Sequence, residues 1–118
     1  MKYLCLIYQD EAELQKWSAE EMSKLSAEYQ ALAEALQKSD YFIAAHGLQP
    51  THTATTVRVR DGKTLITDGP FAETKEQLGS VFIIEAQDLD DAIQVAARIP
   101  SARFGSIEVR PVWAGRST

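Results

Sequence analysis

The chain has 118 residues, of which 45% are hydrophobic and 25% charged, and its net charge is −5. This length fits one globular domain, 1–118, with a single core. The negative charge argues against a nucleic-acid partner, since contact with a phosphate backbone needs a basic stripe. No apolar run approaches the length of a membrane span or of a signal peptide, so we expect a cytoplasmic protein without a membrane partner.

The first predicted element is a strand over residues 3–8 that is apolar on both faces, typical of the middle of a sheet. It contains Cys5, the single cysteine, which we expect to be a buried thiol. Ser18 and Glu21 form a capping box, which predicts a helix from there to about Lys38. Its apolar stripe, at spacings of three and four, is Met22, Leu25, Tyr29, Leu32 and Leu36.

A second strand is predicted over residues 41–45, followed by a loop and then a β-hairpin over residues 55–68. The hairpin is indicated by Asp61-Gly62, which fits a two-residue type I′ turn. In that register Val57 faces Ile66 and Thr55 faces Asp68, all on one side. We therefore expect Asp68 to point toward the covered side of the molecule.

The remaining elements are a strand over residues 81–86, a helix from Asp88 to Pro100, and an alternating edge strand over 107–112. The order β-α-β, hairpin, β-α-β predicts an α+β fold, a ferredoxin-like antiparallel sheet with two helices on one face. A second copy of the chain is the simplest cover for the other face, so we expect a homodimer through the uncovered sheet face.

One stretch, Asp68-Gly69-Pro70-Phe71, carries the strongest functional signal. Gly69-Pro70 forces a corner in the backbone, which fixes the preceding carboxylate at the end of a strand. Asp68 is therefore either a catalytic base or ligand anchor, or a turn residue whose carboxylate accepts backbone N–H groups. Glu73 and Lys75 follow closely. They form either a solvated charged loop or a site in which the lysine neutralises an anion.

His46 is the second catalytic candidate, because its unperturbed pKa suits proton transfer, although a lone histidine is more often a surface residue. Tyr29 places a hydroxyl either in the core or in a pocket between helix and sheet. Arg58 could contact an anionic ligand or pair with an acidic residue. One cysteine and two histidines without a ligand spacing predict no metal, and no motif predicts a cofactor.

The chain resembles the DGPF family of YCII-related proteins along nearly its whole length. The matching segments include 3–8, Gly47-Leu48-Gln49-Pro50, residues 56–62, the Asp-Gly-Pro-Phe stretch and residues 107–112. The resemblance implies a dimeric α+β barrel of bacterial origin, in a family whose role is largely unassigned. His46 and Ser80 depart from the family pattern. In the wider group the first helix can carry a catalytic histidine, where this chain offers Tyr29.

Two functions are consistent with these features. The first is a small-molecule-binding protein or enzyme, with a pocket walled by Tyr29 and Phe71 and polarised by Asp68, His46 and Lys75. The second is a non-catalytic regulatory or interaction module linked to sigma factors of the extracytoplasmic-function type, near which the resemblance places such genes. A cavity favours the first, and a shallow apolar surface favours the second.

Overall fold

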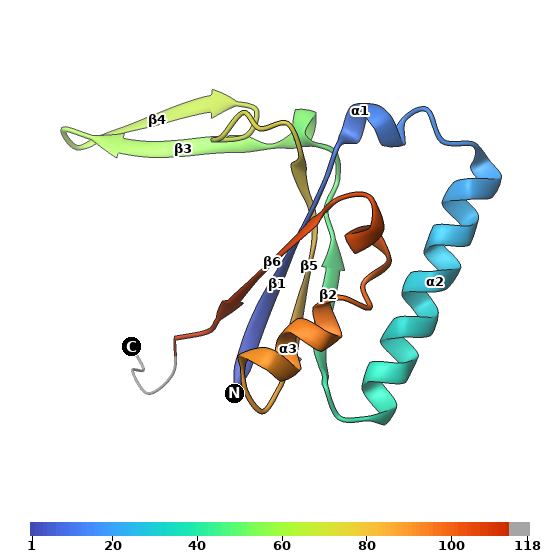
Figure 1. The fold of residues 1–118 in the computed structure, drawn as a ribbon. Helices are drawn as coiled ribbons and strands as arrows, with labels where there is room; N and C mark the ends of the chain where they lie inside the picture. Colours follow the sequence, from blue (N-terminus) through green and yellow to red (C-terminus); the bar gives the residue numbers. More distant parts are fainter. Residues whose placement is uncertain (114–118) are drawn as a thin grey trace.

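The structure is a computed structural model that describes residues 1–113. Four strands form one antiparallel sheet in the order β2-β5-β1-β6, and β3 and β4 form a separate two-stranded hairpin (Figure 1). The strands are β1 (Lys2–Gln9), β2 (Phe42–Gly47), β3 (Thr55–Arg60), β4 (Lys63–Asp68), β5 (Gln77–Glu85) and β6 (Ser106–Pro111). The helices are α1 (Glu11–Leu14), α2 (Ala19–Lys38) and α3 (Leu89–Ala96), with short 3-10 turns η1 (Thr51–Thr53) and η2 (Pro100–Arg103). The α+β, ferredoxin-like prediction is confirmed, with β1 and β5 in the centre of the sheet.

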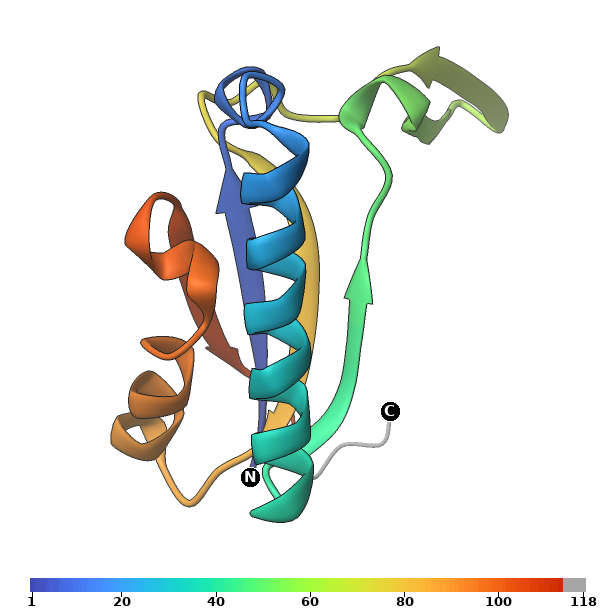
Figure 2. The same ribbon diagram turned by 90° about the vertical axis from the view of Figure 1, so that its right-hand side faces the viewer.

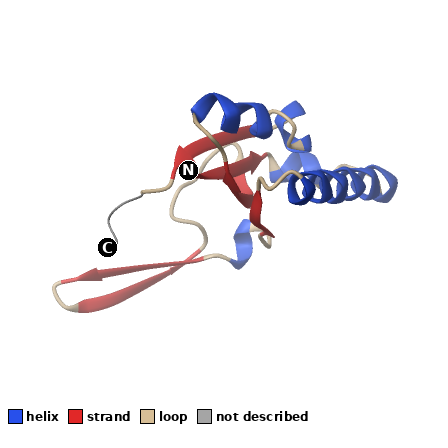
Figure 3. Ribbon diagram, turned by 90° about the horizontal axis from the view of Figure 1, so that it is seen from below, coloured by secondary structure: helices blue, strands red, loops and turns tan. Residues whose placement is uncertain are grey.

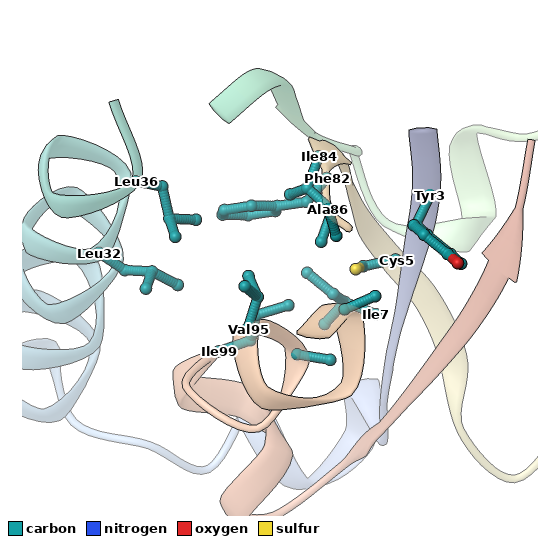
Figure 4. Packing of buried hydrophobic residues seen from close by; sticks show 12 residues of the cluster. Tyr3, Cys5, Ile7, Leu32, Leu36, Phe82, Ile84, Ala86, Val95 and Ile99 are labelled. Carbon is teal, nitrogen blue, oxygen red and sulfur yellow. The ribbon is translucent and has the colours of Figure 1, made fainter. Parts of the chain in front are cut away.

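The core lies between the sheet and the helices α2 and α3, which both lie against one of its faces (Figure 2). Alternate residues of β1 and β5 point into it, and α2 and α3 supply the opposite wall (Figure 4). The cluster includes Tyr3, Cys5, Ile7, Leu32, Leu36, Phe82, Ile84, Val95 and Ile99. Burial of these side chains removes apolar surface from water and is the main force that holds the sheet and the helices together.

The long helix α2 begins as predicted. Ser18 accepts a hydrogen bond from the Glu21 backbone N–H, and the Glu21 side chain accepts one from the Ser18 N–H. Leu25 on this helix is buried, whereas Met22 at the end of the stripe is 40% exposed. The short helix α1, capped by Asp10, lies in a stretch that the sequence predicted as a plain connection. None of the helices in residues 1–113 is long and apolar enough to cross a membrane.

The other face of the sheet is apolar at its centre. Leu4 pairs with Ile83 and Leu6 with Val81 across β1 and β5, and all four side chains are half-buried. Figure 3 shows α2 and α3 on the opposite side. We call this surface, formed by Leu4, Leu6, Val81 and Ile83, the open sheet face.

The hairpin has the predicted register, with Val57 opposite Ile66 and Thr55 opposite Asp68. Asp61 and its neighbour Gly62 have φ values of 51° and 73°, as a type I′ turn requires. The prediction that Asp68 faces a covered side is not met within the protomer, where Asp68 is exposed. The reason is that the hairpin leaves the sheet and projects from its end (Figure 1).

Candidate functional site

A hollow of about 500 Å³ lies at the corner where the end of the sheet meets the base of the hairpin. Tyr8 and Leu78, which pair across β1 and β5, contribute its sheet wall. Pro70 and Phe71 of the Asp-Gly-Pro-Phe stretch line it as well. The other lining residues are Leu48, Gln49, Pro50, Thr51, Thr53, Ala54, Ala72, Thr74 and Gln77. We call this the corner hollow; most of its surface is apolar.

The turn η1 is held beside the corner hollow by α1. The Glu11 carboxylate accepts hydrogen bonds from the Thr51 backbone N–H at 2.9 Å and from the Thr51 hydroxyl at 2.6 Å. The Glu11 backbone N–H donates to the Gln77 side-chain oxygen at 2.9 Å. These three residues come from distant segments. Sequence reasoning missed them because no local pattern marks such pairings.

Pro70 and Phe71 form the side of the corner hollow that we call the motif wall, and contacts to the hairpin hold it in place. The backbone N–H of Gly69, whose φ is 98°, donates to the Ala54 carbonyl at 2.8 Å, and the Thr56 hydroxyl donates to the Gly69 carbonyl at 2.8 Å. The Arg58 guanidinium lies 5.2 Å from the centre of the Phe71 ring, in reach of a cation–π interaction. Phe71 is nevertheless 76% exposed. A large aromatic side chain in water at the rim of a hollow is available to a ligand.

Asp68 is the last residue of β4, one residue before this corner. Its carboxylate takes part in no hydrogen bond and no ion pair with the described residues. The Gly69 N–H donates to Ala54 instead. The turn-residue interpretation therefore lacks the hydrogen bond on which it depended. Among the ion pairs within residues 1–113, none joins Asp68 to Lys75.

Tyr29 and His46 line a different hollow, a groove of about 410 Å³ between α2 and the strands β2 and β5. Ser80 also lines it. We call it the helix groove. His46 is exposed at the end of β2, and it pairs with Val81 of β5.

The Tyr29 hydroxyl is tied to a fully buried serine. Ser101 donates its single hydroxyl hydrogen to the Gln9 side-chain oxygen at 2.6 Å. Because that hydrogen is used, Tyr29 must donate in the 2.5 Å hydrogen bond that joins its hydroxyl to Ser101. Burial raises the pKa of Tyr29. This chain of hydrogen bonds supports the structural interpretation of Tyr29, since its hydroxyl already has a partner.

The other predicted site residues are dispersed. Lys75 lines a third hollow, of about 250 Å³, together with Trp17 and Phe104. Glu73 is exposed in the loop after the motif. The structure thus brings Phe71 and Arg58 together, and Tyr29 and His46 together. The predicted single pocket is not formed: Phe71, the Tyr29–His46 pair and Lys75 line three different hollows. The predicted site residues that line none of these three hollows are Asp68, Glu73 and Arg58.

Cys5 is fully buried in the core, as predicted, and burial raises the pKa of its thiol to about 11. A thiol with such a pKa is almost entirely protonated at neutral pH, which makes it a poor nucleophile. Within residues 1–113, no three His, Cys, Asp or Glu side chains are grouped as metal ligands would be.

Comparisons with known proteins agree with the fold. The family model of the YCII-related domain matches residues 1–115. An uncharacterised protein of Rhizobium meliloti (strain 1021) is 37% identical over 114 residues, which cover 95% of this chain and 92% of that protein. A solved structure, the 5-chloro-2-hydroxyhydroquinone dehydrochlorinase of Burkholderia phenoliruptrix AC1100 in complex with 2,5-dihydroxybenzoquinone, aligns with a TM-score of 0.55. That alignment covers 98% of this chain and 96% of the other, at 17% identity, and supports the fold alone.

Proposed function

The chain belongs to the YCII-related family, and on that premise we propose that it binds a small molecule in the corner hollow beside Asp68-Gly69-Pro70-Phe71. The observation that carries this proposal is the hollow itself. Its volume, about 500 Å³, lies in the range of small-molecule sites, which are mostly apolar with a few polar groups. Its wall includes the motif that distinguishes the chain.

We propose a small, flat aromatic ligand. Phe71 offers an exposed ring for stacking, and Tyr8 adds a second ring with a phenolic hydroxyl. The neighbouring dehydrochlorinase structure holds 2,5-dihydroxybenzoquinone, a molecule of this class, and its ligand is a suitable first probe. An anionic oxygen on the ligand would find Arg58 nearby, because its guanidinium lies over Phe71.

Catalysis at this hollow would need a proton acceptor. Asp68 does not line the hollow, but it is the residue we propose for that role, because its carboxylate has no partner among the described residues and it precedes the motif by one residue of chain. Glu73 and Lys75, in the same loop, are proposed to adjust the charge around a bound anion. His46 would serve a reaction in the helix groove, where Tyr29 is its neighbour.

We further propose that the protein acts as a homodimer in the bacterial cytoplasm, joined through the open sheet face. Leu4, Leu6, Val81 and Ile83 form a central apolar strip there. A specific interface buries about 800 Å² on each partner, which is the area we expect this contact to bury.

The experiment compares two alanine-to-tryptophan variants that fill different hollows. Ala72→Trp places an indole in the corner hollow, and Ala33→Trp places one in the helix groove. Binding of 2,5-dihydroxybenzoquinone is measured by calorimetry. We expect loss of binding with Ala72→Trp and retention with Ala33→Trp. The reverse pattern would move the ligand to the helix groove and refute the proposal.

The second candidate function is an interaction module, and the exposed apolar residues of the hairpin favour it. A sigma factor of the extracytoplasmic-function type is the partner that the family resemblance suggests. Co-sedimentation with a purified sigma factor of the extracytoplasmic-function type would support it, if binding persists when the corner hollow is filled by Ala72→Trp.

A further inference from the structure

The β3–β4 hairpin carries an apolar face that nothing in the described part of the protomer covers. Val57 is 59% exposed, Val59 is 60% exposed, and Ile66 opposite Val57 is 68% exposed. A two-stranded hairpin by itself is at best marginally stable in water and needs packing against another element. We call the Val57, Val59 and Ile66 surface the arm face.

The hairpin points to the side of the molecule on which the open sheet face lies. Figures 1 and 3 both show it extending away from α2. Each of its strands has six residues, which at about 3.3 Å per residue gives an arm of roughly 20 Å. Sheets that pack face to face lie only about 10 Å apart. An arm of that length therefore extends past a sheet packed on the open sheet face.

We propose that the hairpin is a dimerisation arm and that its arm face packs on a second copy of the chain. The inference rests on the homodimer proposed above, because the open sheet face seats the second copy beside the arm. In a two-fold dimer the contact is reciprocal, so each copy's arm packs on the other.

The distribution of charge also favours a second copy of the chain as the partner of the arm face. The hairpin over residues 55–68 has three basic residues, Arg58, Arg60 and Lys63, and two acidic ones, Asp61 and Asp68, so its net charge is +1. The net charge of the whole chain is −5, so the residues outside the hairpin have a net charge of −6. A slightly basic arm is attracted to the acidic body of another copy.

The arm also makes the corner hollow depend on the second copy. The strand β4 runs directly into the motif wall, and Arg58 on β3 lies over Phe71. Without a partner, no other element of residues 1–113 packs on the arm face. The hairpin, and with it the motif wall, would then be poorly ordered. Packing of the arm on a partner therefore completes the ligand site, and ligand affinity should fall when the dimer dissociates.

The experiment introduces a charge on each side of the hairpin. Ile66→Glu places a carboxylate on the arm face, and Leu65→Glu places one at the adjacent position on the opposite face. Both positions are exposed in the protomer, so both variants should fold. Sedimentation equilibrium measures the dimer dissociation constant, and hydrogen exchange measures protection of the amides in residues 55–68.

We expect Ile66→Glu to weaken the dimer by about a hundredfold or more, because an unpaired charge would be buried at each of two reciprocal contacts. Hydrogen exchange in the hairpin should rise in parallel, while Leu65→Glu stays close to the natural chain. A dimer as strong in Ile66→Glu as in the natural chain, or weakened equally by both variants, would overturn the arm assignment.

The dependence of the ligand site on the dimer is tested separately, by measuring the affinity of the natural chain and of Ile66→Glu for 2,5-dihydroxybenzoquinone. Reduced affinity in the dissociated Ile66→Glu variant supports the coupling, and unchanged affinity overturns it. If the natural chain binds no such probe, the proposed ligand class fails, while the sedimentation result still decides the arm.

Discussion

Replacement of Phe71 by alanine separates a binding role from a structural one. The side chain is 76% exposed, so its removal leaves no cavity in the core. The substitution chiefly removes the interaction of the ring with the Arg58 guanidinium, and an exposed cation–π pair contributes about 0.5–1 kcal/mol. We therefore expect Phe71→Ala to lower the free energy of unfolding by no more than about 1 kcal/mol.

Ligand binding should respond far more strongly. An aromatic pair contributes about 0.5–1.5 kcal/mol beyond the area it buries. When the apolar area that the ring would bury against the ligand is added, affinity for an aromatic probe should fall by about tenfold, the equivalent of roughly 1.4 kcal/mol. Phe71→Leu, which keeps an apolar side chain, is the control and should bind with intermediate affinity.

The assay pairs urea unfolding at a fixed protein concentration with calorimetric titration of 2,5-dihydroxybenzoquinone. Fixed concentration matters because the apparent stability of a dimer depends on it. A loss of more than about 2 kcal/mol in unfolding free energy, the range of core substitutions, together with unchanged affinity would contradict a binding role for Phe71. Phe71 would then be a packing residue.

The remaining predictions concern the core, a buried hydroxyl, the motif carboxylate and metal. Leu36→Ala, in the fully buried part of α2, should destabilise the protein by about 2–5 kcal/mol, and Met22→Ala on the exposed end should have a much smaller effect in the same urea assay. The folded-state pKa of Tyr29 is raised, so its contribution to stability is complete below its unfolded pKa of about 10 and is lost as pH rises through the folded value. Tyr29→Phe should flatten this alkaline fall in melting temperature; a curve identical to the natural one would contradict it. Asp68→Asn should change stability by less than about 0.5 kcal/mol, because the carboxylate is exposed and unpartnered among the described residues, but should abolish binding or turnover if Asp68 acts on the ligand. A chelator should leave the melting temperature unchanged, and a clear fall would reveal a structural metal.

The elements that could be predicted are those with a local physical cause. Asp61-Gly62 defines a turn within four residues, and that turn fixes the hairpin register. Ser18 and Glu21 define the start of α2 through hydrogen bonds three residues apart. The two central strands, β1 and β5, were predicted because their residues are apolar on both faces.

The unpredicted features depend on distant segments. The residues near Asp68 in sequence do not predict that the hairpin projects from the sheet. The direction of the hairpin is set by the corners where the chain enters and leaves it. The hydrogen-bonded chain through Tyr29, Ser101 and Gln9 joins three separate elements. The pocket residues were predicted as one group because they share suitable chemistry, but the fold places Phe71, Tyr29 with His46, and Lys75 in different hollows and leaves Asp68 outside them.

The most direct test is a crystal structure of the protein grown in the presence of 2,5-dihydroxybenzoquinone. We expect a dimer joined through the open sheet faces, with the ring of the ligand stacked on Phe71 and close to Tyr8 and Leu78. A ligand in the helix groove beside Tyr29 and His46, with the corner hollow empty, would contradict it.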